Sequence, residues 1–329
     1  MTPVVVLFIC LIAATVIIAG FIVYAITVKS HSRHPARIDR YRIIKELPAG
    51  GMSRIFLGKR GDEGLVIVKI PIESNPREDS LAKFLEEGKI LSLLKHPHIV
   101  GLEEYKKITM NNMQTGFVAL EYVEGMSLDK LIRGGRKFSH QAASLIVSSV
   151  ADALAAAHKA GIYHRDISTN NIILTYEGSK IKGVKLIDFG IAKWQSGSEH
   201  TLRDMMKEHY ASPEQITRED LDGRSDIYSL GIVYYELITG RKPFDNWDRK
   251  KLPPSPNELG LTLPENIDRL IMQLLAPEKE KRIQNAADIA KRNGTLPLGG
   301  KPYVAASKTG SQKETMGESW GFSESLAGY

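Results

Sequence analysis

The spacing of three polar residues near the middle of the chain limits its fold and chemistry more than any other feature of the sequence. Asp166 is followed five residues later by Asn171, and Asp188 stands 17 residues beyond Asn171. In a phosphoryl-transfer site, one carboxylate orients the attacking hydroxyl, while a second carboxylate and an amide hold Mg²⁺ on the nucleotide phosphates. Each residue alone could be an ordinary turn former. The three together predict a site of phosphoryl transfer.

A second constraint lies at the N-terminus. From Pro3 to Val28 the sequence has 26 residues without a charge, more than the roughly 20 apolar residues that span a bilayer. Basic residues follow at once, namely Lys29, Arg33, Arg37, Arg40 and Arg42. By the positive-inside rule, we expect residues 3–28 to form a single-pass transmembrane helix with the N-terminus outside and the rest of the chain in the cytoplasm. A buried core helix is the alternative, which so long an uncharged run disfavours.

Composition excludes two other classes of protein. The formal net charge of +6 is mild for 329 residues, and no basic stripe with interleaved aromatic residues indicates nucleic-acid binding. Cys10 is the only cysteine, so no disulfide can form within the chain. The folded part is therefore suited to a reducing compartment.

Periodicity divides the remainder of the chain. Residues 29–40 form a basic juxtamembrane linker, and residues 41–292 alternate strand-like and helical patterns. The strand candidates come first, at 41–47, 53–59, 65–70 and 117–122, with a helix at 79–95 between them. Beyond Gly125 the patterns are mostly helical, including 142–159 and 225–239. This order predicts an α+β fold with a small sheet-rich lobe and a larger helical lobe. Residues 293–329, rich in Gly, Ser, Thr and Lys, are expected to form a flexible tail.

Two features of the sheet-rich part suit the same chemistry. Gly50 and Gly51 lie between the first two strands, where backbone N–H groups can approach phosphates, although an ordinary hairpin has the same composition. Lys69 ends the third strand in an apolar setting, and burying its ammonium group without an anionic partner is costly. Glu87 on the following helix is the candidate partner, with Glu86 beside it as a competitor. The alternative is that Lys69 reaches solvent at the strand end.

Three motifs together resemble the eukaryotic-type (Hanks-type) serine/threonine protein kinases in their bacterial-like form. They are His164-Arg165-Asp166 with Asn171, Asp188-Phe189-Gly190, and Ala211-Ser212-Pro213-Glu214. The resemblance covers residues 41–292. It implies the bilobal protein-kinase fold, here preceded by one transmembrane helix, with a small β-rich N-lobe and a larger helical C-lobe. It also implies that Arg282 forms a buried ion pair with Glu214.

The resemblance implies a role for each site residue. Asp166 acts as the catalytic base, while Asn171 and Asp188 hold Mg²⁺. Lys69 contacts the α- and β-phosphates of ATP, and Glu87 holds Lys69 in place. The backbone at the hinge between the lobes binds adenine. The residues implied at the nucleotide are Gly50, Gly51, Ile55, Ile67, Lys69, Glu121, Val123 and Ile173.

The sequence departs from the family pattern inside the catalytic loop. Ser168 stands where the family has a lysine that reaches the γ-phosphate, and Lys207 stands where the family has a threonine. We hypothesise that Lys207 supplies the charge that Ser168 lacks. The alternative is that Lys207 is a solvated loop lysine. Pro48 and Ser53 also replace two glycines of the phosphate-binding loop.

These features predict a membrane-anchored protein kinase. It would transfer the γ-phosphoryl group of ATP to serine or threonine hydroxyls of protein substrates, itself included, using Mg²⁺ or, as a substitute, Mn²⁺. A homodimer would allow one copy to phosphorylate another. The main alternative is a pseudokinase, a binding or scaffold module with little or no transfer, which Ser168 favours and Asp166, Asn171 and Asp188 oppose. A small-molecule phosphotransferase is disfavoured, because it should lack the Ala-Ser-Pro-Glu motif.

Overall fold

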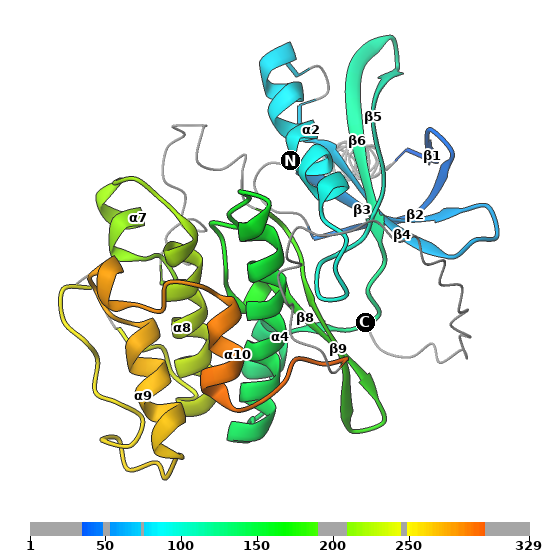
Figure 1. Ribbon diagram of the computed structural model, residues 1–329. Helices are drawn as coiled ribbons and strands as arrows, with labels where there is room; N and C mark the ends of the chain where they lie inside the picture. The colour runs from blue at the N-terminus through cyan, green and yellow to red at the C-terminus, as the bar shows by residue number, and fades with distance from the viewer. Residues whose placement is uncertain (1–34, 49–52, 74–75, 190–208, 245–248, 300–329) are drawn as a thin grey trace, which may run out of the picture.

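The computed structural model describes residues 35–48, 53–73, 76–189, 209–244 and 249–299. Within these ranges a sheet-rich lobe is followed by a helical lobe, as Figure 1 shows. The expected bilobal α+β architecture is thereby confirmed. None of the helices in these ranges is long and apolar enough to cross a bilayer. The predicted transmembrane helix (3–28), Gly50, Gly51, Lys207 and most of the predicted tail lie outside the described residues.

The small lobe is built on an antiparallel sheet of six strands in the order β1-β2-β3-β4-β6-β5. The strands are β1 (Arg37–Ile38), β2 (Tyr41–Leu47), β3 (Ser53–Arg60), β4 (Leu65–Pro71), β5 (Leu102–Met110) and β6 (Met113–Glu121). Helix α2 (Glu78–Leu93) packs on β5 and β6. It does so through a buried stripe of Leu81, Leu85 and Leu91, at the spacing of one helix face.

Strand β5 was not predicted, and its position explains why. It lies at the edge of the sheet and pairs only with β6 among the described strands. Most of its side chains are exposed or half-buried, including Lys106 and Lys107. Charged residues are common on edge strands, where they discourage pairing with other chains, and they erase the apolar alternation that identifies a strand.

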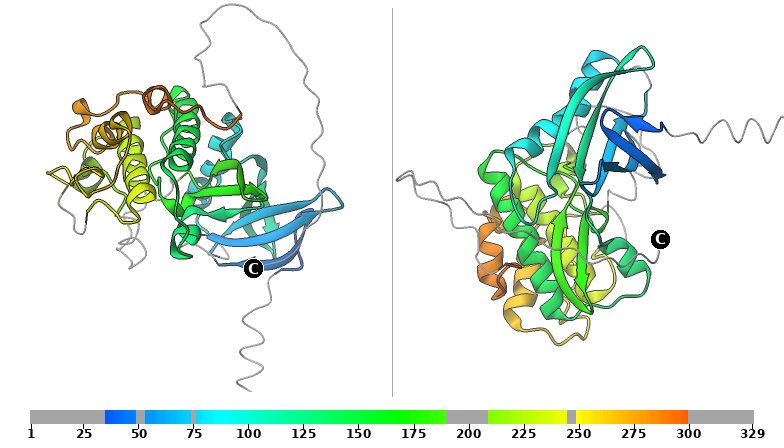
Figure 2. Two further views of the ribbon diagram at one scale, coloured as in Figure 1. Left: turned by 90° about the horizontal axis from the view of Figure 1, so that it is seen from below. Right: turned by 90° about the vertical axis from the view of Figure 1, so that its right-hand side faces the viewer.

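The large lobe contains a short three-stranded sheet and a group of helices (Figure 2). Its strands are β7 (Met126–Ser127), β8 (Ile172–Glu177) and β9 (Lys180–Leu186). Its helices are α3 (Leu128–Arg133), α4 (His140–Lys159), α7 (Pro213–Thr217), α8 (Gly223–Thr239), α9 (Glu265–Leu274) and α10 (Ala287–Asn293), with 3₁₀ turns η1 (Thr169–Asn171) and η2 (Lys279–Lys281). Helices α4 and α8 pack against each other, and α10 packs on α4.

Local signals fix the ends of the two central helices. The Ser139 hydroxyl accepts a hydrogen bond from the N–H of Ala142 and so caps the start of α4. The Asp222 carboxylate does the same for α8 through the N–H of Arg224. Gly240 ends α8 in the left-handed conformation, with φ of 73°, which glycine adopts without steric cost. Most residues of both helices are buried, and the two helices form the framework of the large lobe.

Two clusters of buried side chains form the interior. The larger joins α2, α4, α8 and α9 with β8 and β9, whereas the smaller lies within the strands of the small lobe, around Tyr41, Phe56 and Phe117. Gly125 follows the segment that links the lobes. A Cβ atom at this position would collide with the carbonyl oxygen of Leu174 on β8, so the link can pack closely on the large lobe only with glycine here.

Candidate active site

The catalytic loop, residues 164–171, is anchored to the centre of the large lobe. The Asp226 carboxylate on α8 accepts hydrogen bonds from the backbone N–H groups of His164 and Arg165, at 2.9 and 2.7 Å. The same carboxylate lies 2.8 Å from Nε2 of His158 on α4. Burial alone would raise the pKa of Asp226, but the hydrogen bond and charge of His158 and the contacts of His164 hold that pKa below its usual value. Asp226 therefore stays ionised and fixes the backbone of the loop.

Asp166 and Asn171 lie together at the end of this loop. The side-chain amide of Asn171 donates to the backbone carbonyl of Asp166 at 2.7 Å and to its carboxylate Oδ2 at 3.0 Å. The Asn171 backbone carbonyl accepts from the N–H of Ile187 at 2.9 Å, so the loop is also tied to the end of β9. The structure thus brings the two predicted groups into direct contact.

Asp188, which follows Ile187, contacts a residue of the small lobe. Lys69, which is 6% exposed on β4, donates to Glu87 Oε1 at 2.8 Å and also to a carboxylate oxygen of Asp188. Burial alone would lower the pKa of Lys69, but the charges of Asp188 and Glu87 raise it above its usual value. The ammonium group is therefore charged. Glu86 pairs instead with Lys89 at 3.4 Å, which leaves Glu87 as the partner.

Backbone strain also marks this site. Arg165 and Asp188 both adopt the left-handed conformation, with φ of 62° and 58°. Asp tolerates that region through its short polar side chain, whereas an arginine there is held by its surroundings. The hydrogen bonds of Asp226 to the loop backbone supply part of that hold. Strained residues of this kind cluster at functional sites, where the surrounding structure over-determines them.

The predicted nucleotide-contacting residues that the structure describes come from both lobes. Ile55 on β3 lies opposite Lys69 of β4, and Ile67 precedes Lys69 by two residues on the same strand. Ile173 lies on β8 of the large lobe, and Val123 lies in the link between the lobes. All four apolar side chains are half-buried rather than fully buried, as the wall of an apolar pocket would require.

Glu121, at the end of β6, uses its side chain to tie the link in place. Its carboxylate accepts from the backbone N–H of Gly101 at 2.8 Å and pairs with Lys185 of β9 at 2.5 Å. Its backbone N–H donates to the Gly101 carbonyl at 2.9 Å. The prediction assigned the backbone of Glu121 to adenine, so it does not conflict with these contacts. The Glu121 side chain holds the link between the lobes.

The oxygen donors present suit a magnesium ion bound together with a nucleotide. Mg²⁺ is commonly held by one or two protein groups, with phosphates and water completing its octahedron. Asp188 offers a carboxylate and Asn171 an amide oxygen, which are both hard ligands. No group of three or more His, Cys, Asp or Glu that could hold a metal on protein ligands alone occurs in the described ranges. The donor set therefore fits Mg²⁺ carried by ATP.

Several residues that support the loop were not assigned a role from sequence. Gln215, in the first turn of α7, donates to the backbone carbonyl of Arg165 at 3.0 Å. Thr169 lies 2.7 Å from the hydroxyl of Tyr210, which in turn donates to Glu236 on α8 at 2.5 Å. These contacts join residues 26 to 50 positions apart in the chain, so no local pattern in the sequence predicts them.

Ser168 is the point at which the loop departs from the family pattern. Its side chain is 1% exposed, and its hydroxyl has no hydrogen-bond partner in the described ranges. A buried hydroxyl without a partner is unfavourable, and such groups in native proteins need an explanation. The hypothesis that Lys207 provides the missing charge concerns a residue outside the described ranges and stays a prediction.

Comparison with known proteins agrees with the fold and the motifs. The family model described as protein kinase domain matches residues 41–292. The chain therefore belongs to the protein kinase family, which confirms the resemblance that its motifs carry. The kinase domain of PknI from Mycobacterium tuberculosis shares the fold, with a TM-score of 0.60 at 24% sequence identity, over 78% of this chain and 96% of that domain.

Its relatives are bacterial serine/threonine kinases. The chain is 31% identical over 266 residues to the probable serine/threonine-protein kinase PknB of Lactococcus lactis. It is 30% identical over 262 residues to serine/threonine-protein kinase PrkC of Bacillus subtilis. Each comparison covers 76% of this chain but 41% and 39% of those proteins. The chain thus spans about two fifths of the length of these curated relatives.

Proposed function

We propose that this protein is an ATP-dependent serine/threonine protein kinase. The observation that carries the proposal is the meeting of Lys69, Glu87 and Asp188 from three separate elements, next to a loop in which Asn171 is bonded to Asp166. Positioning and electrostatic stabilisation are what phosphoryl transfer requires of a protein. The relatives named above support serine and threonine as the acceptors.

Each residue has a defined task in this proposal. Lys69 binds the phosphates of ATP, and Glu87 keeps its ammonium group in place. Asp188 and Asn171 would hold Mg²⁺, which would supply positive charge beside the phosphate oxygens. Asp166 accepts the proton of the attacking hydroxyl as that oxygen bonds to the γ-phosphorus and the bond to ADP breaks. The apolar side chains of Ile55, Ile67, Val123 and Ile173 would line the adenine pocket.

The proposal predicts that transfer depends on magnesium. The 329-residue chain incubated with γ-labelled ATP and Mg²⁺ should incorporate acid-stable label on serine or threonine, in itself and in an unstructured acceptor protein. Chelation with EDTA should reduce incorporation to background, because the phosphates then lose their neutralising ion. If transfer occurs between two copies, labelling per molecule should rise with protein concentration.

Two results would contradict this proposal. Tight binding of Mg-ADP without any label transfer would identify a pseudokinase. Acid-labile label, or label on neither serine nor threonine, would indicate a different acceptor chemistry.

We also propose that residues 3–28 anchor the protein in a membrane with the kinase domain on the cytoplasmic side. The uncharged run of 26 residues and the basic cluster after it support this topology. The protein should remain with membranes after an alkaline wash. A protease added outside intact cells should spare the kinase domain, whereas inverted vesicles should expose it. Release by the wash, or digestion from outside, would overturn the topology.

A further inference from the structure

The described chain ends in an extended segment, residues 294–299, which we call the strap. It leaves α10 at Gly294, which is left-handed with φ of 67°, and crosses α4 to end beside β9 (Figure 1). Its starting point is fixed by Asn293. The amide of Asn293 donates to the Ser144 carbonyl at 2.8 Å and to the Ser148 hydroxyl at 2.9 Å, and its Oδ1 accepts from Tyr234 at 2.6 Å. The strap thus begins from a rigid base.

The far end of the strap is held by side chains from two other elements. The N–H of Leu298 donates to the hydroxyl of Ser149 on α4 at 3.0 Å, and its carbonyl oxygen lies 2.9 Å from Nε2 of His98. The backbone of an irregular surface segment usually bonds to water. Here both polar groups of one residue are bound by side chains 149 and 200 positions earlier in the chain. That arrangement specifies a docking position for the strap.

His98 connects the strap to the loop that follows α2. This loop, residues 94–101, carries the end of α2 into β5. The ring of His98 is 4% exposed, and its Nδ1 lies 3.0 Å from the carbonyl of Val184 on β9. Burial lowers the pKa of His98, and a neutral ring donates from only one nitrogen. Val184 and Leu298 therefore compete for one proton, and His96, paired with Asp152 of α4 at 3.1 Å, is the adjacent ionisable group.

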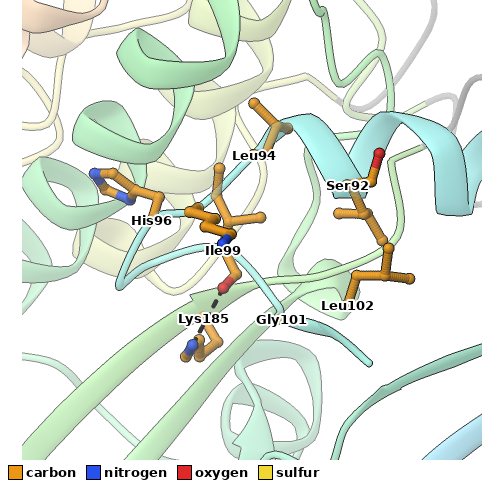
Figure 3. A pocket seen from close by; sticks show the side chains of 9 residues that line it. Ser92, Leu94, His96, Ile99, Gly101, Leu102 and Lys185 are labelled. Atoms are coloured by element: carbon orange, nitrogen blue, oxygen red, sulfur yellow. Dashed lines mark hydrogen bonds between the residues drawn. The ribbon is translucent and has the colours of Figure 1, made fainter. Parts of the chain in front are cut away.

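The other side of the loop faces a pocket that is partly open to solvent. The pocket has a volume of about 380 Å³, and Leu94, His96 and Ile99 of the loop line it together with Lys185 (Figure 3). Other contacts also hold the loop: the N–H of Val100 donates to the Leu186 carbonyl at 3.0 Å, and Lys185 donates to the Ile99 carbonyl at 3.1 Å. The strap adds a further contact at His98.

We propose that the strap positions α2, and through α2 the Glu87–Lys69 pair. Ser149, His98 and Leu298 are then positioning residues that hold the loop at the end of α2 against the large lobe. Release of the strap would allow α2 to move and would weaken the hold of Glu87 on Lys69. Because the strap continues into residues 300–329, tension or binding on that part of the chain would act on the nucleotide site. The consequence for catalysis rests on the proposed kinase function, whereas the mechanical coupling does not.

Variants of the 329-residue chain test this coupling by hydrogen exchange. Ser149→Ala removes the acceptor for Leu298. His98→Asn places a side-chain amide at the position of Nδ1, which keeps the contact with Val184 and removes the contact with Leu298. His98→Gln places the amide at the position of Nε2, which keeps the contact with Leu298. Loss of one hydrogen bond changes an opening equilibrium about five-fold. Ser149→Ala and His98→Asn should therefore speed exchange about five-fold both in the strap and in α2, while His98→Gln should stay close to wild type.

The second readout is the affinity for Mg-ADP, which a purely structural role would leave unchanged. It should fall in Ser149→Ala and His98→Asn but not in His98→Gln. Faster exchange in the strap with unchanged exchange in α2 and unchanged affinity would overturn the proposal, as would unchanged exchange in the strap itself. Exchange needs no phosphoryl transfer, so a chain that shows the coupling but labels no acceptor would refute the kinase function and leave the coupling standing.

Discussion

An Asp166→Asn variant is expected to lose phosphoryl transfer by about 10²–10⁴-fold, the range that a positioned general base contributes. An amide cannot accept the proton of the attacking hydroxyl. The fold should survive, because the amide of Asn171 also donates to the backbone carbonyl of residue 166, at 2.7 Å. The new side chain also keeps an oxygen that can accept from Asn171. The measurement is the initial rate of label transfer at saturating ATP and Mg²⁺.

A loss confined to the rate of transfer, with nucleotide affinity and stability unchanged, would identify Asp166 as the base. Affinity for Mg-ADP and the midpoint of thermal unfolding should change little. Lys69, the proposed phosphate-binding residue, is held by Glu87 and Asp188, and Asp166 takes no part in those ion pairs. Asp288→Asn, the same chemical change in an exposed pair on α10, is the matched control and should transfer at the wild-type rate. Transfer by Asp166→Asn at the wild-type rate would exclude Asp166 as the base.

A Glu214→Ala variant is expected to lose about 3–5 kcal/mol of the free energy of unfolding. Glu214 and Arg282 have side chains that are 2% and 0% exposed, and they form two hydrogen bonds, at 2.6 and 2.8 Å. Arg282 also donates to the carbonyls of Ala276 and Pro277. Truncating Glu214 would leave a guanidinium group buried without its counter-charge. Urea unfolding of the 329-residue chain measures the loss.

The free energy of unfolding lost on removing a carboxylate should depend on the burial of the ion pair and on pH. Glu265→Ala, which removes a carboxylate from an exposed pair with Arg269, should cost no more than about 1 kcal/mol. Burial alone would raise the pKa of Glu214, but hydrogen bonds from Arg282 and Ser225 lower it below its usual value of 4.5. A lowered folded-state pKa adds stability above pH 4.5 that is lost as the pH falls through that pKa. The gap between wild type and Glu214→Ala should therefore narrow in acid, and a gap that widened would contradict this account.

The sequence identifies the proposed catalytic groups better than the framework that holds them. Asp166, Asn171 and Asp188 are readable because phosphoryl transfer requires those residue types at limited spacings. The sequence favours Glu87 over Glu86 only through the family resemblance, because a small error in the helix phase exchanges adjacent positions. The structure places Glu87 at Lys69. The Tyr210–Glu236 and Gln215–Arg165 contacts depend on how distant segments pack, which local patterns do not encode.

In the fold, too, elements that depend on distant contacts were harder to predict than elements with a local pattern. Buried helices such as α4 and α8 carry long apolar faces and distinct caps, so their existence follows from periodicity. Edge strand β5 is mostly exposed and charged, so its pairing with β6 becomes visible only in the folded chain. The docking of residues 294–299 was not anticipated either, because it depends on single hydrogen bonds to Ser149 and His98 rather than on a repeated pattern.

The contact of Lys69 with both Glu87 and Asp188 has an electrostatic consequence for the protein before it meets a nucleotide. Two carboxylates at one site would repel each other, but the buried ammonium group lies between them as an internal counter-ion. In the proposed kinase, Asp188 would hold the metal that accompanies ATP, and Lys69 would bind the phosphates. Nucleotide binding would then exchange one ionic partner of Asp188 for another and leave neither carboxylate without a positive neighbour.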